Sequence, residues 1–119
     1  MARNAPSLDA YGDGGFRLSG QRHEGSVLIL RDEARAWPVS NIAELTPESL
    51  APVIEAGARE VEFLLLGVGR ANALPPRPVR EALRGAGIGL EYMDTATAAR
   101  TYNVLTAEGR RLACALIAI

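Results

Sequence analysis

Hydrophobic and polar positions alternate in blocks along the second half of the chain. Apolar runs typical of buried strands are interleaved with stretches whose composition is typical of helices. The predicted strands are 61–66, 88–93 and 110–119, and the predicted helices between them are 78–84 and 94–108. Because strands that alternate with helices form crossover connections, this half of the chain predicts an α/β fold with a largely parallel sheet covered by helices.

The first half of the chain is predicted to add a smaller β-structure to that sheet. Residues 16–18 and 26–30 have the pattern of a β-hairpin whose turn holds residues 21–24. Residues 1–15 are small, polar and rich in glycine, so we expect a flexible or irregular start. The hairpin is therefore interpreted as an N-terminal addition to the α/β core.

Two further elements are predicted between the hairpin and the first buried strand. Residues 34–37 form a short strand, and a helix begins at Thr46 or Ser49 and ends at Gly57. Trp37 is interpreted as a core anchor in preference to an anchor of a protein interface.

Length and composition bound the possible functions. The chain has 119 residues, which predicts a single domain over residues 1–119, and its net charge of −1 argues against a dedicated nucleic-acid binder. One cysteine allows no internal disulfide, and no apolar run has the length of a signal peptide or a membrane span. We therefore expect a cytoplasmic protein that does not insert directly into a membrane.

A candidate site follows from the predicted sheet. Ligands of open parallel sheets bind beyond the carboxyl ends of the strands, where residues 67–74 and 93–95 form two loops. Gly67 and Gly69 resemble part of a dinucleotide-binding loop, but Asn72 replaces its third glycine, and a simple sharp turn is the preferred interpretation. Asp94 has a structural explanation as the cap of the following helix.

The helix at 94–108 holds the remaining candidates. Tyr102 is expected to pack on the sheet, while Arg100 and Asn103 share another face. Arg100 has the chemistry to bind an anion, but an ion pair with Glu91, Asp94 or Glu108 is the preferred interpretation. The predicted crevice for a ligand or partner comprises Gly67, Gly69, Arg70, Asp94, Thr95, Arg100, Tyr102 and Asn103.

No set of residues predicts a metal, a cofactor or a catalytic centre. One histidine, one cysteine and scattered carboxylates lack the usual metal-ligand spacing, and no serine lies in a nucleophile-elbow sequence. Arg77, Arg80 and Arg84 make a basic helix face, for which a solvated surface is preferred over nucleic-acid binding.

Several segments together resemble one small family. They are Tyr11-Gly12, Gly14-Gly15-Phe16-Arg17, Gly25-Ser26-Val27-Leu28, Leu64–Gly69, Glu91–Thr95 and Arg100–Arg110. The family includes the mitochondrial complex I assembly factor 3, the adipogenesis-associated single-domain protein of animals and short bacterial relatives. The resemblance implies a three-layer α/β domain whose mixed central sheet has its last strand, 110–119, antiparallel. It also implies no established enzymatic activity and no agreed catalytic residues.

Two hypotheses about function from different classes follow. The preferred one is a non-enzymatic protein-binding domain that assists assembly of a respiratory or other membrane complex, with an unknown protein partner. The alternative is a domain or enzyme that binds an anionic small molecule in the predicted crevice. The sequence leaves the partner, the ligand and the oligomeric state open.

Overall fold

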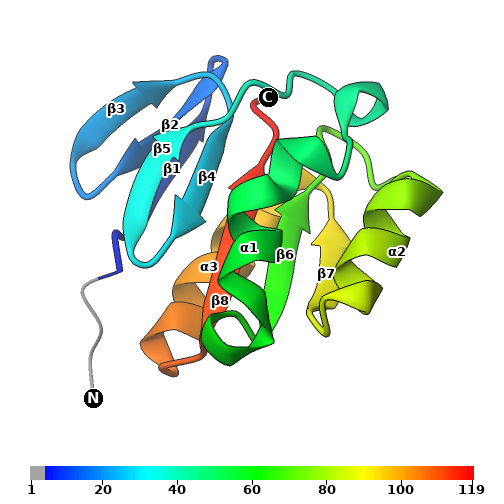
Figure 1. Ribbon diagram of the computed structural model, residues 1–119. Coiled ribbons are helices and arrows are strands. Elements are labelled where there is room, and N and C mark those ends of the chain that lie inside the picture. The colour runs from blue at the N-terminus through cyan, green and yellow to red at the C-terminus, as the bar shows by residue number, and fades with distance from the viewer. Residues whose placement is uncertain (1–4) are drawn as a thin grey trace.

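The computed structural model describes residues 5–119, which form two β-sheets and three α-helices. Figure 1 shows how they are arranged. The strands are β1 (Leu8–Gly12), β2 (Gly15–Leu18), β3 (Gln21–Glu24), β4 (Val27–Leu30), β5 (Glu33–Ala36), β6 (Phe63–Gly67), β7 (Gly89–Met93) and β8 (Leu112–Leu116). The α-helices are α1 (Ala51–Glu60), α2 (Arg77–Gly85) and α3 (Thr95–Ala107), and single 3₁₀ turns lie at Ile42–Glu44 and Glu48–Leu50. The predicted mixed α/β domain is confirmed.

The central sheet has the strand order β5-β4-β8-β6-β7. The three strands β8, β6 and β7 are parallel to one another, while β4 is antiparallel to β8 and to β5. The expectation that the last strand is antiparallel therefore holds for its contact with β4 and is wrong for its contact with β6. The strand whose direction is reversed within this sheet is β4, because it enters from the N-terminal β-structure rather than from a crossover helix.

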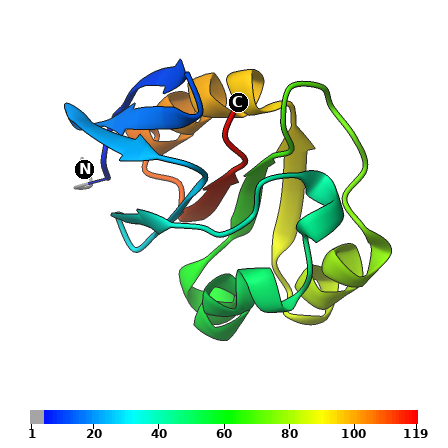
Figure 2. The same ribbon diagram turned by 90° about the horizontal axis from the view of Figure 1, so that it is seen from above.

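The central sheet is the middle of three layers, with α1 and α2 on one face and α3 and the small sheet on the other (Figure 2). Alternate residues of β6 face opposite sides: Leu64 and Leu66 pack with α1 and α2, whereas Phe63 and Leu65 pack with α3 and the small sheet. Both faces are buried, which is why β6 and β8 are almost continuously apolar. Trp37 is buried as predicted, and its indole N–H donates to the backbone oxygen of Ser49 at 2.8 Å.

The N-terminal β-structure is larger than the predicted hairpin. Strands β1, β2 and β3 form a separate antiparallel sheet, and residues 21–24 are strand β3 rather than a turn. The turn lies at Ser19 and Gly20, which both have positive φ angles, as a two-residue hairpin loop of type I′ requires. Residues 8–12 of the predicted irregular start form β1, and residues 1–4 of that start lie outside the described residues.

The helix boundaries follow local chemistry. Helix α3 begins after Asp94, whose side chain accepts the backbone N–H of Thr97, and Gly109 follows its end with a φ of 77°. In α1 the helical backbone is interrupted at Gly57, with a φ of 75°, where the sequence predicted its end. Each helix within residues 5–119 is too short or too polar to span a membrane.

Candidate functional site

The carboxyl ends of β6, β7 and β8 meet at Thr95, the first residue of α3. Its hydroxyl group accepts the backbone N–H of Gly69 at 3.0 Å and donates to the carbonyl oxygen of Ile117 at 2.8 Å. The backbone N–H of Thr95 donates to the carbonyl oxygen of Gly69 at 2.8 Å. Thr95 is fully buried, so this side chain fastens the loop after β6 to the chain that leaves β8.

Gly67 allows Thr95 to approach this closely. A Cβ atom at Gly67 would lie 2.9 Å from Leu116 Cδ2, 3.0 Å from the Cα atom of Thr95 and 3.1 Å from its hydroxyl oxygen. The first distance is shorter than real Cβ contacts, and the second involves backbone that cannot move aside cheaply. The predicted crevice therefore brings Gly67, Gly69, Asp94 and Thr95 together, and the space between its two loops is filled by Thr95.

Asp94 sits at the mouth of this strand end as the N-cap of α3. Its two carboxylate oxygens accept the backbone N–H of Thr97 at 3.0 Å and the hydroxyl of Thr97 at 2.8 Å. These hydrogen bonds favour the charged form and hold the pKa of Asp94 below its ordinary value, with a smaller contribution from the positive charge of Arg100. The helix cap thus accounts for both oxygens of Asp94.

Arg100, Tyr102 and Asn103 all reach the N-terminal segment of the chain. The Asn103 amide accepts the backbone N–H of Leu8 at 2.9 Å and donates to the carbonyl oxygen of Leu8 at 2.8 Å. The buried Tyr102 donates its hydroxyl hydrogen to the carbonyl oxygen of Pro6 at 2.8 Å. These contacts attach β1 to α3 and give the segment around Tyr102 a structural role.

Arg100 is exposed, and the preferred ion pair with Glu91, Asp94 or Glu108 is wrong. Its guanidinium group donates to the Tyr11 hydroxyl at 3.2 Å and lies 3.5 Å from the hydroxyl of Thr97. Across the described part of the chain, Arg100 forms no salt bridge with a carboxylate. Arg70 is also exposed, in the loop after β6. These two arginines and Asn103 are the exposed members of the predicted set, and the amide of Asn103 is already bonded to the backbone of Leu8.

Nucleophilic and metal chemistry has little support in this part of the molecule. Cys114 lies in β8 with its side chain fully buried, and this burial raises the pKa of its thiol far above the ordinary range. Within residues 5–119, no three His, Cys, Asp or Glu side chains lie close enough together to hold a metal ion.

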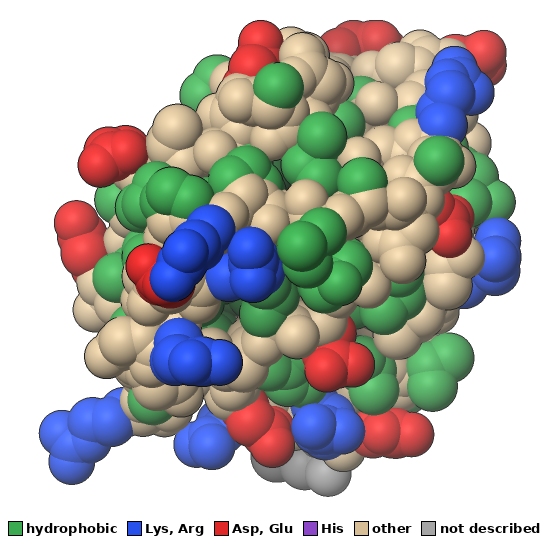
Figure 3. Space-filling model, turned by 90° about the vertical axis from the view of Figure 1, so that its right-hand side faces the viewer, with side chains coloured by type: hydrophobic (Ala, Val, Ile, Leu, Met, Phe, Trp, Pro, Cys, Tyr) green, Lys and Arg blue, Asp and Glu red, His purple; other side chains and the backbone are tan. Residues whose placement is uncertain are grey.

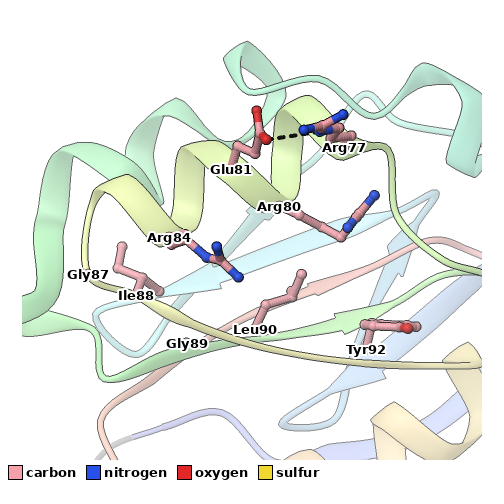
Figure 4. Close-up of a pocket in the computed structure, with 9 residues that line it drawn as sticks. All are labelled: Arg77, Arg80, Glu81, Arg84, Gly87, Ile88, Gly89, Leu90 and Tyr92. Atoms are coloured by element: carbon pink, nitrogen blue, oxygen red, sulfur yellow. Dashed lines mark hydrogen bonds and ion pairs between the residues drawn. The ribbon is translucent and has the colours of Figure 1, made fainter.

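A hollow lies at the outer edge of the central sheet, between α2 and β7. This groove has a volume of about 860 Å³. Three arginines of α2 form one wall and the side chains of Leu90 and Tyr92 lie along the strand opposite (Figure 4). Seen from this side, arginine side chains gather beside hydrophobic ones on the surface (Figure 3). We call this hollow the β7-edge groove; its lining residues are Arg77, Arg80, Glu81, Arg84, Gly87, Ile88, Gly89, Leu90 and Tyr92.

The predicted site did not include this groove, although the sequence does show the arginines that form one of its walls. Arg77, Arg80 and Arg84 are spaced to lie on one helix face, and that face was interpreted as solvated. The spacing of these arginines does not reveal that α2 lies beside β7, the last strand of the sheet, because that position depends on the strand order.

Comparison with known proteins places this architecture among related chains. A model of the family described as "Protein of unknown function (DUF498/DUF598)" matches residues 8–117. An uncharacterised protein of Rhodobacter capsulatus is 38% identical over 110 residues, which cover 92% of this chain and 82% of that protein.

Two further relatives have names that describe different kinds of protein. The NADH dehydrogenase (ubiquinone) 1 alpha subcomplex assembly factor 3 of Bos taurus is 34% identical over 92% of this chain, which spans 59% of that protein. A crystal structure from Bartonella henselae, described as an outer membrane protein, has a TM-score of 0.89 at 33% identity, and the match covers 96% of this chain and 95% of that chain. Both similarities extend over nearly the whole of this chain, although the names of the two relatives describe different kinds of protein.

Proposed function

This chain belongs to the DUF498/DUF598 family, and from that premise we propose that it is a non-enzymatic protein-binding domain that assists the assembly of a respiratory or other membrane complex. The observation that carries the proposal is the likeness to an NADH dehydrogenase assembly factor over 92% of this chain. Because this chain spans 59% of that factor, the activity of the longer protein is extended here only as far as the shared domain.

The geometry of the strand ends supports a binding role over catalysis. Thr95, Tyr102 and Asn103 each use their polar atoms to satisfy backbone groups of the fold. Catalytic groups need free polar atoms that converge on a reacting substrate. These three residues instead hold the sheet, α3 and β1 together, which suits a domain that acts as a rigid partner.

A second candidate function is the binding of an anionic small molecule beside Arg100. It is favoured by the absence, among the described residues, of a carboxylate salt bridge to that guanidinium. A screen of anionic metabolites by thermal shift tests it, with Arg100→Ala as the comparison. A ligand that raises the melting temperature of the wild type but not of this variant supports the second function.

The assembly role is tested by deleting the gene in its host and separating the membrane complexes on native gels. We expect less assembled NADH dehydrogenase or another respiratory complex, and restoration when the chain is expressed again. A deletion strain with unchanged amounts of every assembled respiratory complex contradicts the proposal.

A further inference from the structure

Strand β7 has an open edge. It is the last strand of the central sheet, and β6 is its sole strand partner within residues 5–119. The N–H of Gly89 donates to the carbonyl oxygen of Glu62, and the carbonyl oxygen of Met93 accepts the N–H of Val68, so these residues bond toward β6. Backbone groups alternate along a strand, so the N–H and C=O groups of Leu90 and Tyr92 point away from the sheet.

An open edge of this kind accepts an additional strand. Exposed rows of backbone donors and acceptors are a template on which an extended peptide pairs. The opposite edge strand, β5, carries Glu33 and Arg35, charged side chains of the kind that protect an edge from pairing. Strand β7, with the sequence Gly-Leu-Glu-Tyr-Met, carries a single charged residue, Glu91, and lies beside the β7-edge groove.

The wall of the groove carries excess positive charge. Glu81 pairs with Arg77 at 2.9 Å, and the Nε of Arg80 donates to the carbonyl oxygen of Pro75 at 3.0 Å. The guanidinium group of Arg84 has no hydrogen-bond or ion-pair partner among the described residues. The wall therefore has three arginines and one glutamate in a chain whose net charge is −1. Such a surface is complementary to a segment with carboxylate side chains.

The spacing of the arginines fits an extended segment. Arg80 and Arg84 are four residues apart in α2, which separates them by about 6 Å along the helix axis. Alternate residues of an extended strand are about 6.8 Å apart and point to the same face. Carboxylates at every second position of an added strand therefore match the two arginines.

The other face of β7 favours apolar side chains between those carboxylates. A hollow of about 280 Å³ lies there between the sheet and α3. It is lined in part by Phe63, Leu65, Met93 and Leu105, and Glu91 lies on the same side of the strand. Arg110 also lines this hollow but pairs with Glu62 at 3.3 Å. An acidic side chain there would therefore still meet the negative charge of Glu91, whereas an apolar one would bury surface against these neighbours.

We propose that the open edge of β7 binds an extended segment of a partner protein as an additional strand, with acidic side chains facing the arginines of α2 and apolar side chains alternating with them. This inference rests on the proposed protein-binding function and names the chemistry of the partner. A second copy of the chain fits less well. Antiparallel pairing of two β7 strands places both α2 helices on the same face, where their arginines repel one another.

The test is the binding of a fluorescently labelled peptide in which glutamate alternates with valine, measured by fluorescence anisotropy. The double variant Arg80→Gln, Arg84→Gln is expected to bind about tenfold more weakly than the wild type, the combined effect of two ion pairs at the protein surface. Arg35→Gln removes an exposed arginine from the opposite edge and should bind like the wild type. Unchanged circular dichroism melting of each variant shows that folding is retained.

Two altered peptides separate charge from strand pairing. A peptide in which lysine alternates with valine, and a glutamate–valine peptide with N-methylated amides along one edge, should both fail to bind. The inference is overturned if either binds like the parent peptide, if the parent does not bind, or if the double variant binds unchanged. A dimer in solution whose β7 edge the peptide does not open also overturns it.

The two proposals fail in distinguishable ways. If deletion of the gene reduces a respiratory complex and the Arg80→Gln, Arg84→Gln variant restores it fully, the assembly role stands and the β7 edge is not its binding surface. If the peptide binds as expected but deletion leaves the respiratory complexes unchanged, the edge is a binding surface and the assembly role fails.

Discussion

Replacing Thr95 with valine tests whether this residue closes the strand-end crevice. Valine has nearly the shape of threonine, so the packing against Gly67 is retained and only the hydroxyl is lost. The wild-type hydroxyl accepts the N–H of Gly69 and donates to the carbonyl oxygen of Ile117. The variant therefore isolates the two hydrogen bonds from the packing around them.

The expected loss of stability depends on which backbone groups are left without a hydrogen-bond partner in the variant. A net hydrogen bond contributes about 1 kcal/mol, and a buried group left without a partner costs about 1 to 3 kcal/mol. The N–H of Gly69 is half-buried and can regain water, whereas Ile117 is buried. We therefore expect Thr95→Val to lower the free energy of unfolding by about 2 to 4 kcal/mol.

Urea unfolding followed by circular dichroism measures this change. Thr95→Ser is the matched control, because it keeps the hydroxyl and loses one methyl group, at a cost of about 1 kcal/mol. The denaturant dependence of the unfolding free energy should be the same in all three proteins. A Thr95→Val protein as stable as the wild type, or more stable than Thr95→Ser, would refute the structural role of the hydroxyl.

Three other predictions concern α3 and β8. Asn103→Ala removes both hydrogen bonds to the backbone of Leu8 and should destabilise the protein by about 1 to 2 kcal/mol, with faster hydrogen exchange in β1; unchanged exchange there contradicts it. The folded-state pKa of Asp94 is lowered, so its stabilising effect is complete above the unfolded pKa of about 3.9 and is lost as the pH falls through the folded value. Asp94→Asn should weaken this acid dependence in unfolding titrations, and an identical pH profile would contradict the cause. Burial raises the pKa of Cys114, so Ellman's reagent should label the native protein only as fast as it unfolds, and rapid labelling would contradict its burial.

Local signals in the sequence were sufficient for the second half of the fold. Asp94 caps α3 and Gly109 follows its end, as predicted from residue types alone. The strands β6 and β8 are buried on both faces, so their apolar runs were visible without alternation. Here propensity, hydrophobic pattern and capping all favour the same elements.

The N-terminal sheet was harder to predict because its outer strands are short and mostly exposed, and because β1 is held by a distant residue of α3. Residues 21–24 are polar and resemble a turn, yet they pair with β2 as the outer strand of a small sheet. Leu8 belongs to β1, which pairs with β2 and is held by Asn103, a residue 95 positions away. A hydrophobic pattern carries no information about such backbone pairing.

The candidate site was likewise predictable only where local sequence determines it. Thr95 and Gly67 were placed at the correct strand ends, because parallel strands bring their carboxyl ends to one edge. Thr95 is held in this space by its hydrogen bond to Ile117, which follows β8, and the sequence did not determine the position of β8 in the sheet. The arginines of α2 were recognised as one face, but their strand neighbour β7 was not.

The most direct test of the central claim is to locate peptide binding residue by residue. The claim is that this domain recognises partners at the β7 edge. Nuclear magnetic resonance spectra of the ¹⁵N-labelled protein, titrated with the glutamate–valine peptide, should shift the amide signals of Leu90 and Tyr92 and the side-chain signals of Arg80 and Arg84. The amides of Gly69 and Thr95 should stay in place. Shifts centred on Gly69, Thr95 and Arg100, with β7 unaffected, would contradict the account and return recognition to the strand ends.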